Sequence, residues 1–402
     1  MQRKDLRRLP RNVWVVSATS LLNDISSEMV LNLIPFFLAN VLGVRTSIIG
    51  LIEGIAETTA SLLKVVFGAL SDRLGKRKQL TVIGYALSAF TKPLLYFAST
   101  WELILGVRVA DRIGKGIRTA PRDALIADSI SQDQRGISFG LHRAADTLGA
   151  FIGLAIAALV IWMTQSQALL LSPATFRTVV LYSIIPGILA VIVLAVGAVE
   201  VTGIGKGSGV KRLSFRETDV RFRYFLLVVV LFTLGNSSDA FILLRGQERG
   251  LNMLQVMGMA LTFNAVYTIF AGPFGALSDR VGRRKLIIGG WIAYGLVYLG
   301  FALSQAGWQI WMLFAFYGLY YAATEGAARA LVADLVPEST RGTAYGLFNA
   351  AVGIAALPAS VIAGVLWQGV GAWTGFGPSA PFLFGAAMAL LAGILFIRLV
   401  KE

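Results

Sequence analysis

One stretch of the chain occurs twice, and this repeat limits the possible folds more than any other feature of the sequence. Residues 67–78 read FGALSDRLGKRK and residues 274–285 read FGALSDRVGRRK, at an offset of 207 residues. Each copy follows a long apolar segment and leads into the next one through a short loop with one acid and several bases. A repeat at about half the chain length indicates two related halves.

Shorter matches keep nearly the same offset. They are RGISFGL at 135–141 with RGTAYGL at 341–347, Ala127-Asp128 with Ala333-Asp334, and Ser26-Ser27-Glu28 with Ser237-Ser238-Asp239. These registers indicate that a unit of six spans was duplicated in parallel. We therefore expect an N-terminal half at 1–199, a cytoplasmic linker at 200–221 and a C-terminal half at 222–402.

The composition excludes a soluble domain. The chain is 56% hydrophobic and 14% charged, and runs of about 20 apolar residues, each long enough to cross a bilayer, recur throughout. We predict an all-α membrane protein with twelve transmembrane helices, in two six-helix halves related by a pseudo-two-fold axis. The predicted spans are 12–38, 46–70, 80–98, 102–127, 137–163, 177–199, 222–247, 252–277, 286–304, 307–333, 342–368 and 380–399.

The basic residues fix the expected orientation. With alternate loops assigned to the cytoplasm, those loops and the termini hold 23 Lys and Arg, and the opposite loops hold 3. This asymmetry predicts that both termini are cytoplasmic. The basic segment 1–11 is then a retained flank and not a signal peptide, and the net charge of +14 does not indicate nucleic-acid binding. Short loops favour a bacterial inner membrane.

The sequence offers little for catalysis or metal binding. It has no cysteine and one histidine, His142, so disulfides are excluded and we expect no transition-metal site. No nucleophile–base pair is recognisable. We therefore expect neither an enzyme nor a cofactor.

The repeated loop carries a family resemblance. The pattern Gly68-xxx-Asp72-Arg73-x-Gly75-Lys76-Arg77 resembles the loop 2–3 motif of the major facilitator superfamily, and the second copy is equally complete. The resemblance covers the whole chain. It implies a central cavity lined by spans 1, 4, 7 and 10, which opens to either side in turn as the halves rock.

Two further motifs resemble the drug:proton antiporter branch of that superfamily. Residues 112–116 (RIGKG) resemble its span 4 motif, with Lys115 where Gln is common. Gly140, Gly149 and Gly153 match the glycine spacing of its span 5 motif, but Leu154 stands where proline is expected. The same glycines would also permit close helix packing.

Charged side chains inside the predicted spans are the candidates for proton coupling. A charge at mid-bilayer costs at least about 2.5 kcal/mol, so these residues should face a wet interior or one another. In span 1, Asp24 and Glu28 share one helical face. In span 4, a single stripe holds five cations and must face the interior: Arg108, Arg112, Lys115, Arg118 and Arg122.

The acids have two interpretations. They neutralise the basic stripe as a buried ion-pair network, or Asp24, Glu28 or Glu57 carries the proton with Arg112 as its partner. Burial favours the protonated carboxyl group and a nearby Arg favours the ionised one, so movement of Arg112 would drive proton uptake.

The second half contributes polar side chains for substrate binding. Asn236, Ser237, Ser238 and Asp239 form a polar break in span 7. The predicted substrate-binding residues are Arg108, Lys115, Asn236, Asp239, Asn264, Tyr267, Tyr317, Tyr321 and Glu325. Packing is the alternative for the tyrosines, and Glu325 is also placed to pair with Arg329. A few polar groups in an apolar pocket suit an amphipathic organic molecule.

The loop motif suggests a gate. Asp72 ends span 2, and the resemblance implies that it contacts the N-terminus of span 11 in one state, where an anion is stabilised. The predicted gating residues are Asp72, Arg73, Arg77, Asp128, Asp279, Arg280, Gly149 and Gly153. Arg73 and Arg77 are expected to pair with Asp123 or Asp128.

Together these features predict a secondary active transporter that works by alternating access, with proton-coupled efflux of a small organic solute. The alternative is uptake or exchange of an organic anion, because the basic stripe leaves the cavity positive. A remote alternative is a non-transporting membrane receptor. The expected partners are a small-molecule substrate, protons and the lipid bilayer, with the protein acting as a monomer.

Overall fold

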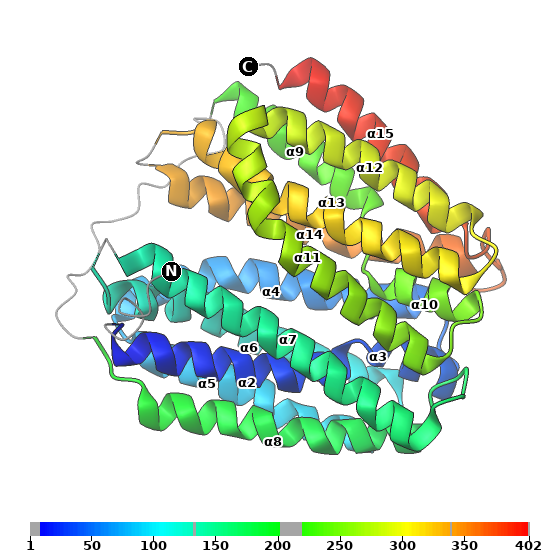
Figure 1. The fold of residues 1–402 in the computed structure, drawn as a ribbon, viewed down its shortest axis with the longest axis horizontal. Helices are drawn as coiled ribbons and strands as arrows, with labels where there is room; N and C mark the ends of the chain where they lie inside the picture. The colour runs from blue at the N-terminus through cyan, green and yellow to red at the C-terminus, as the bar shows by residue number, and fades with distance from the viewer. Residues whose placement is uncertain (1–8, 132–133, 202–218, 338–339, 401–402) are drawn as a thin grey trace. The chain divides into compact units, whose positions relative to one another are not determined.

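The computed structural model describes residues 9–131, 134–201, 219–337 and 340–400, apart from the side chains of Asp72 and Asp279. All regular elements in these residues are helical (Figure 1). In chain order they are α2 (Arg11–Leu31), α3 (Ile34–Phe36), η1 (Phe37–Val41), α4 (Thr46–Leu74), α5 (Arg77–Thr91), η2 (Lys92–Phe97), α6 (Trp101–Asp128), α7 (Arg135–Gln165), α8 (Pro173–Gly197), α9 (Val220–Gly235), α10 (Ala240–Glu248), α11 (Met253–Val281), α12 (Arg283–Leu303), α13 (Gly307–Asp334), α14 (Arg341–Gln368) and α15 (Ala380–Leu399).

These elements make up twelve spans, because α2–α3–η1, α5–η2 and α9–α10 are interrupted helices. Within the described residues, nine spans are apolar and long enough to cross a membrane. The other three are α4, α6 and α13, and α6 is the helix that carries the predicted basic stripe. The prediction of an all-α protein with twelve spans is confirmed.

The chain divides into two compact units. The first consists of the described residues of Met1–Leu42, Thr59–Gln165 and Leu171–Val210, and the second of those of Gly43–Thr58, Ser166–Leu170 and Lys211–Glu402. The first part of α4 therefore packs within the second unit, although the chain order would place it in the first half.

Glycine makes the tight turn in both copies of the repeated motif. Gly75 lies between α4 and α5 with φ 62°, and Gly282 lies between α11 and α12 with φ 96°. Residues with a Cβ atom rarely adopt this left-handed region. The repeated glycine therefore allows each apolar helix to end and the next to begin within two residues.

In the first unit, α2 packs against both α7 and α8. The contact with α7 is close because α7 presents glycine to the backbone of α2. A Cβ atom added at Gly149 would lie 2.5 Å from the carbonyl oxygen of Leu21, and one added at Gly153 would lie 2.5 Å from that of Ile25. These glycines hold two helices at backbone contact.

In the second unit, an aromatic core joins α9, α12, α13 and α15. Phe232 of α9 stacks on Trp291 of α12, with ring centroids 4.7 Å apart. The first part of α4 contacts α14 through hydrogen bonds from Thr46 Oγ1 to the Gly364 carbonyl oxygen (3.1 Å) and from Thr58 Oγ1 to that of Gly353 (2.6 Å).

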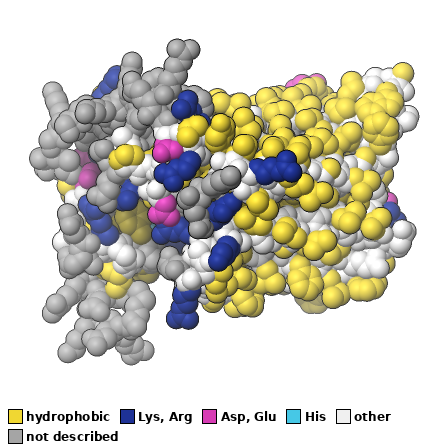
Figure 2. Space-filling view, turned by 90° about the horizontal axis from the view of Figure 1, so that it is seen from above, with side chains coloured by type: hydrophobic (Ala, Val, Ile, Leu, Met, Phe, Trp, Pro, Cys, Tyr) yellow, Lys and Arg dark blue, Asp and Glu magenta, His cyan; other side chains and the backbone are white. Residues whose placement is uncertain are grey.

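The molecular surface is that of a membrane protein. Large apolar side chains such as Met163, Val196 and Leu390 are largely exposed. On the face shown in Figure 2, hydrophobic side chains cover most of the area, and Lys and Arg gather toward one end. Soluble monomers rarely expose apolar surface on this scale.

Candidate functional site

The predicted acidic pair lies in the first unit on α2. Asp24 and Glu28 are both half-buried. Asn23 Nδ2 donates to Asp24 Oδ1 over 3.0 Å, and Asn32 Nδ2 donates to Glu28 Oε2 over 3.0 Å. Each carboxylate is thus hydrogen-bonded to an amide of its own span, and neither is engaged in an ion pair among the described residues.

Lys92 lies beside this pair, and the sequence reasoning gave it no role. Its side chain is 4% exposed, and its ammonium donates to the hydroxyl oxygens of Ser26 (2.7 Å) and Ser27 (3.0 Å). It occupies the point where α5 gives way to η2, just before Pro93. A Lys-Pro pair inside an apolar run was the available signal, because proline interrupts the helix there.

The basic stripe of α6 faces the protein interior, as predicted: Arg108 is 3% and Arg118 6% exposed. Arg118 Nη1 donates to Ser88 Oγ over 2.5 Å, and its guanidinium lies 4.5 Å from the ring centroid of Tyr85. The stripe also contains an acid that the sequence reasoning missed. Asp111 is buried, and the charges of Arg112, Lys92, Arg118 and Arg108 act on its carboxylate.

We call this set of residues the charged cluster: Asp24, Glu28, Lys92, Arg108, Asp111, Arg112 and Arg118. Asp111 offsets part of its positive charge. Arg112 and Lys115 are half-buried on the same face of α6. The predicted stripe is therefore one side of a mixed cluster of acids and bases.

A second group in the same unit lies toward the loop end of α6. Arg122 pairs with Asp123 at 2.9 Å and donates to Ser20 Oγ over 3.3 Å. His142 is buried, with Nε2 3.7 Å from Asp146 Oδ2.

Each half has a similar ion pair between the first residue of the helix after the repeated loop and the last residue of α6 or α13, although Arg77 aligns with Arg284 within the repeat. Arg77 Nε lies 3.2 Å from Asp128 Oδ2, and Arg283 pairs with Asp334. The pair between Arg77 and Asp128 was one of those expected from the sequence. Other predicted gating residues are less defined, because Arg73 and Arg280 are exposed and the side chains of Asp72 and Asp279 lie outside the described residues.

The second unit contains a contrasting site. The predicted polar break in span 7 is present, because α9 ends at Gly235 and α10 begins at Ala240. The hydroxyl of Tyr317 on α13 donates to Asp239 Oδ1 over 3.0 Å and lies 3.2 Å from Asn236 Oδ1. Tyr294 on α12 donates to the Gly235 carbonyl oxygen over 2.9 Å.

We call this set the tyrosine cluster: Asn236, Asp239, Tyr294, Tyr298, Tyr317, Tyr320 and Tyr321. Four of its tyrosines are buried, and Tyr321 is half-buried like Asp239. Sequence reasoning missed Tyr294 and Tyr298, whose only signal was an aromatic spacing typical of ordinary packing.

The other predicted binding residues of the second unit have local partners. Tyr267 donates to Glu325 Oε2 over 2.6 Å, and Arg329 Nη2 lies 2.9 Å from Glu325 Oε1. Asn264 donates to the Ala260 carbonyl oxygen of its own helix over 3.0 Å. Glu325 therefore pairs with Arg329, which was one of the two expectations.

Glu53 and Glu57 of α4 belong to the second unit, whereas Asp24 and Glu28 belong to the first. Ser238 Oγ lies 3.5 Å from Glu53 Oε2, which brings a second carboxylate near the helix break. Glu57 is exposed. The predicted coupling residue Glu57 is thus grouped with a different unit from the α2 pair.

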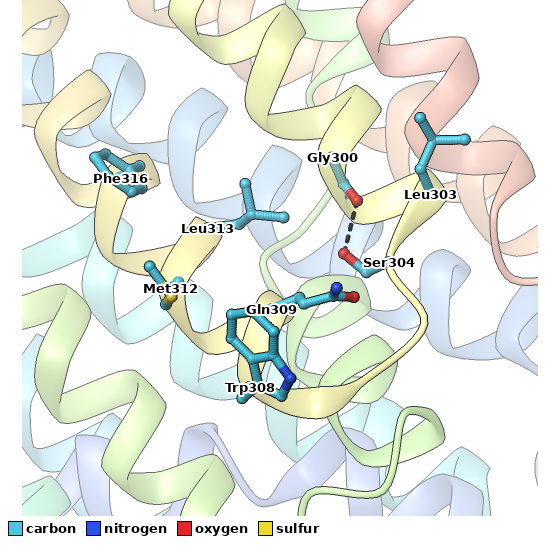
Figure 3. A pocket seen from close by; sticks show the side chains of 8 residues that line it. All are labelled: Gly300, Leu303, Ser304, Trp308, Gln309, Met312, Leu313 and Phe316. Carbon is cyan, nitrogen blue, oxygen red and sulfur yellow. Dashed lines mark hydrogen bonds between the residues drawn. The ribbon is translucent and has the colours of Figure 1, made fainter.

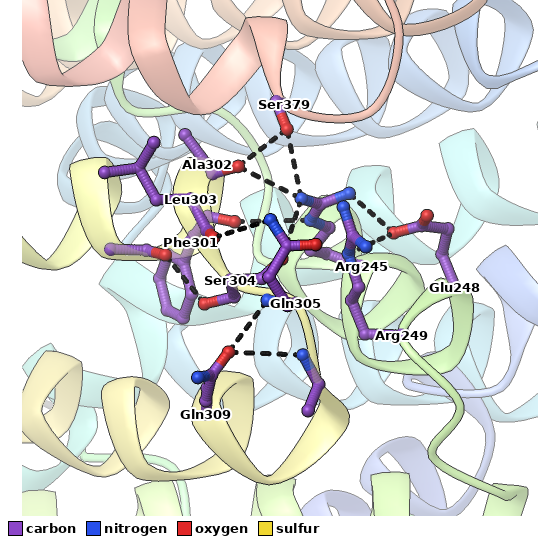
Figure 4. Close-up of polar contacts among 12 residues, drawn as sticks. Arg245, Glu248, Arg249, Phe301, Ala302, Leu303, Ser304, Gln305, Gln309 and Ser379 are labelled. Atoms are coloured by element: carbon purple, nitrogen blue, oxygen red, sulfur yellow. Dashed lines mark hydrogen bonds and ion pairs between the residues drawn. The ribbon is translucent and has the colours of Figure 1, made fainter.

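A buried arginine fastens one end of the second unit (Figure 4). Arg245 on α10 is fully buried and contacts Glu248 Oε2 (2.5 Å), the carbonyl oxygens of Phe301 and Ala302 (3.2 Å each) and Ser379 Oγ (3.0 Å). It joins α10 to the last turn of α12 and the start of α15. A buried Arg with this many acceptors is structural.

The surface also has a hollow of about 340 Å³ between α12 and α13 (Figure 3). Its lining is mostly apolar and includes Trp308, Met312 and Phe316, which are exposed. None of the residues of the charged or tyrosine cluster lines it. Within the described residues, no group of His, Cys, Asp and Glu is arranged to hold a metal ion.

Comparison with known proteins now decides the family. The Major Facilitator Superfamily profile matches residues 16–261 and 224–402. The chain belongs to the Major Facilitator Superfamily. An uncharacterized MFS-type transporter of Methanocaldococcus jannaschii is 36% identical over 397 residues, which cover 97% of this chain and 95% of that protein.

More distant members of the superfamily agree. The class G tetracycline resistance protein of Vibrio anguillarum is 25% identical over 335 residues, covering 79% of this chain and 81% of the relative. The crystal structure of a nucleoside transporter superposes with a TM-score of 0.78 at 14% identity, over 97% of this chain and 100% of that one. This superfamily member is accordingly an integral membrane protein of the secondary-transporter class and not an enzyme.

Proposed function

We propose that this superfamily member is a proton-coupled antiporter that exports a small organic solute by alternating access. The observation that supports this most is the pair Asp24 and Glu28, two half-buried carboxylates on one face of α2. The relative that confers tetracycline resistance supports export over uptake.

The proton step follows from the electrostatics of the charged cluster. Asp24 is close enough to Glu28 and Asp146 for repulsion between their charges, and to Arg118 for attraction. Acids crowded together in a poorly hydrated site favour binding a proton, and a neighbouring Arg favours releasing it. A shift of α6 relative to α2 would change this balance, and this links protonation to conformation.

The proposal also covers the orientation of the protein in the membrane, its oligomeric state and its cytoplasmic gate. We propose that the protein works as a monomer in a bacterial inner membrane with both termini in the cytoplasm, and the excess of Lys and Arg in alternate loops and at the termini supports this orientation. Asp72, Asp279 and the exposed Arg73 and Arg280 would act at the cytoplasmic gate, supported by the ion pair between Arg77 and Asp128.

Exchange or uptake of an organic anion is the second candidate. It is supported by Lys92, Arg108 and Arg118, three cations buried in one unit. Asp111 argues against it, because an acid among these cations lowers the net charge that an anion would meet.

The test is solute flux into proteoliposomes under an imposed pH gradient, with a panel of cationic, neutral and anionic organic solutes. The proposal predicts accumulation that depends on the gradient and on Asp24 and Glu28, for solutes that are cationic or neutral. Flux restricted to anions would favour the second candidate. Absence of flux for every solute would favour a non-transporting receptor and contradict both.

A further inference from the structure

The two halves can be compared position by position. Helices α6 and α13 both have 28 residues, and an offset of 206 brings the C-terminal Asp128 of the first onto Asp334 of the second. The repeated motif itself has an offset of 207, but α12 begins one residue earlier than that offset gives, so the offset of 206 brings the first residue of α5, Arg77, onto that of α12, Arg283. Each of these two helices of the charged cluster therefore has a defined counterpart in the second unit.

The two halves have an acid at one matched position, but the cations of the first half are replaced by uncharged residues in the second. Glu28 corresponds to Asp239 through the repeated Ser-Ser-acid sequence. At the matched positions Lys92 becomes Tyr298, Arg108 becomes Phe314, Asp111 becomes Tyr317, Arg112 becomes Gly318, Lys115 becomes Tyr321 and Arg118 becomes Thr324. Five cations of the charged cluster region are thus replaced by residues without charge, three of them aromatic.

This exchange leaves Asp239 in an unusual environment. Its hydrogen bond comes from the neutral hydroxyl of Tyr317, and the charge that acts on it is another acid, Glu53, whose Oε2 lies 3.5 Å from Ser238 Oγ at the same break. Among the described residues, no Lys or Arg pairs with Asp239. An ionised carboxylate inside a membrane is unfavourable in free energy unless a cation lies beside it. A positively charged ligand would therefore stabilise the Asp239 carboxylate.

The partly exposed residues of the tyrosine cluster are suited to binding a cation. Asp239 and Tyr321 keep exposed surface while Tyr317 is buried between them and other rings. The ring of Tyr321 stands at 77° to that of Tyr317, with centroids 5.2 Å apart, and the Tyr317 hydroxyl donates to Asp239 Oδ1 over 3.0 Å. Aromatic faces attract cations within about 6 Å of the ring centroid.

We propose that Asp239 and Tyr321 form the recognition site for the positively charged group of an organic cation, which is the substrate class of this transporter. The carboxylate supplies the charge and the phenol ring supplies a cation–π contact. The inference rests on the proposed transport function, because it names the solute that the transporter would carry. In the first half, Lys92 and Lys115 occupy the positions of Tyr298 and Tyr321, and their positive charges would repel such a cation.

The experiment measures equilibrium binding to the purified full chain with two ions of the same shape and opposite charge. Radiolabelled tetraphenylphosphonium and tetraphenylborate are dialysed against wild type and four variants: Asp239→Asn, Asp239→Glu, Tyr321→Phe and Tyr321→Leu. Asp219→Asn is the matched control, because Asp219 is exposed at the start of α9 and Asn also caps helices well.

We expect tetraphenylphosphonium to bind wild type, Asp219→Asn and Tyr321→Phe with similar affinity. Asp239→Asn should lose affinity about tenfold or more and Tyr321→Leu about threefold, with Asp239→Glu in between. Tetraphenylborate should bind more weakly than the cation to every form. Equal cation binding by Asp239→Asn, a preference for the anion, or no cation binding by wild type would each overturn the proposal.

The binding result is distinguishable from failure of the proposed function. Binding is measured without a pH gradient, so it does not depend on proton coupling. Cation binding that requires Asp239, combined with flux that ignores the gradient, would uphold the recognition site and reject proton coupling. Gradient-driven flux of neutral solutes, with no effect of Asp239→Asn on cation binding, would uphold proton coupling and reject the recognition site.

Discussion

The hydroxyl group of Tyr317 donates a 3.0 Å hydrogen bond to Asp239 across the break between α9 and α10. The same oxygen lies 3.2 Å from Asn236 Oδ1. Asn236 follows the last residue of α9 and Asp239 precedes the first residue of α10. One phenol of α13 therefore fixes both sides of an interrupted helix.

Removing this hydroxyl should loosen the break without disturbing the aromatic packing. We expect Tyr317→Phe to lower the free energy of unfolding by about 1–2 kcal/mol, because it deletes the hydrogen bond from a buried hydroxyl to a half-buried acid. Thermal unfolding in detergent measures the effect. Tyr345→Phe is a suitable control, because Tyr345 donates to the Arg329 carbonyl oxygen on an exposed surface. Equal stability of Tyr317→Phe and wild type would show that the ring alone holds the break.

The ion pair between Arg77 and Asp128 should contribute to the cytoplasmic gate. Both side chains are partly buried, at 12% and 18% exposure, so solvent screens the pair only in part. We expect Arg77→Asp and Asp128→Arg each to slow solute turnover severalfold while insertion into the membrane is retained. The double exchange should restore much of the rate. If the double variant is as slow as the slower single variant, Arg77 and Asp128 do not act through each other.

Close packing of α2 on α7 predicts a sharp difference between two glycines of the same helix. A Cβ atom at Gly149 would lie 2.5 Å from the Leu21 carbonyl oxygen, whereas one at Gly140 would have no atom of another helix within 4 Å among the described residues. Overpacking of this kind costs about 1–3 kcal/mol. Gly149→Ala should therefore lower the melting temperature by several degrees, and Gly140→Ala should leave it unchanged or raise it. Similar melting of the two variants would contradict the backbone contact.

Arg245 should be among the most sensitive positions for stability. Its replacement by Met would leave the Glu248 carboxylate without its closest partner and would remove the hydrogen bonds from Arg245 to the carbonyl oxygens of Phe301 and Ala302 and to Ser379 Oγ. The Glu248 side chain is 36% exposed, so solvent screens the ion pair in part, and the cost of the change comes mainly from the buried hydrogen bonds that Arg245 donates, at about 1–3 kcal/mol for each acceptor left unsatisfied. We expect Arg245→Met to unfold at a much lower temperature than Arg249→Met, since Arg249 is half-exposed and contacts Glu248 at 3.2 Å. Comparable stability of the two variants would show that the contacts of Arg245 with α12 and α15 do not stabilise the second unit.

The sequence determines the span count and the turns because both depend on local chemistry. Apolar runs must be helical in a bilayer, where each backbone polar group needs an internal partner. Gly75 and Gly282 mark turns that only glycine makes easily, and the run from Asn236 to Asp239 marks a break that the structure contains.

Most contacts between helices could not be predicted from the sequence, because they depend on residues far apart in the chain. The role of Lys92 depends on Ser26 and Ser27 of another helix, and a helix that is apolar nearly all round gives no pattern that fixes its rotation. Asp111 was missed because the surrounding arginines dominate the pattern of α6. The grouping of Glu53 with Ser238 follows from how α4 divides between the two units, which chain order cannot indicate.

The most direct test of proton-coupled antiport is proton movement inside proteoliposomes that contain a pH-sensitive dye and an acidic lumen. Adding a transported solute outside should make the lumen alkaline faster in wild type, because each solute that enters is exchanged for protons. Asp24→Asn combined with Glu28→Gln should abolish that acceleration while Asp219→Asn preserves it. Solute entry in wild type with no change in the rate of alkalinisation would contradict the account.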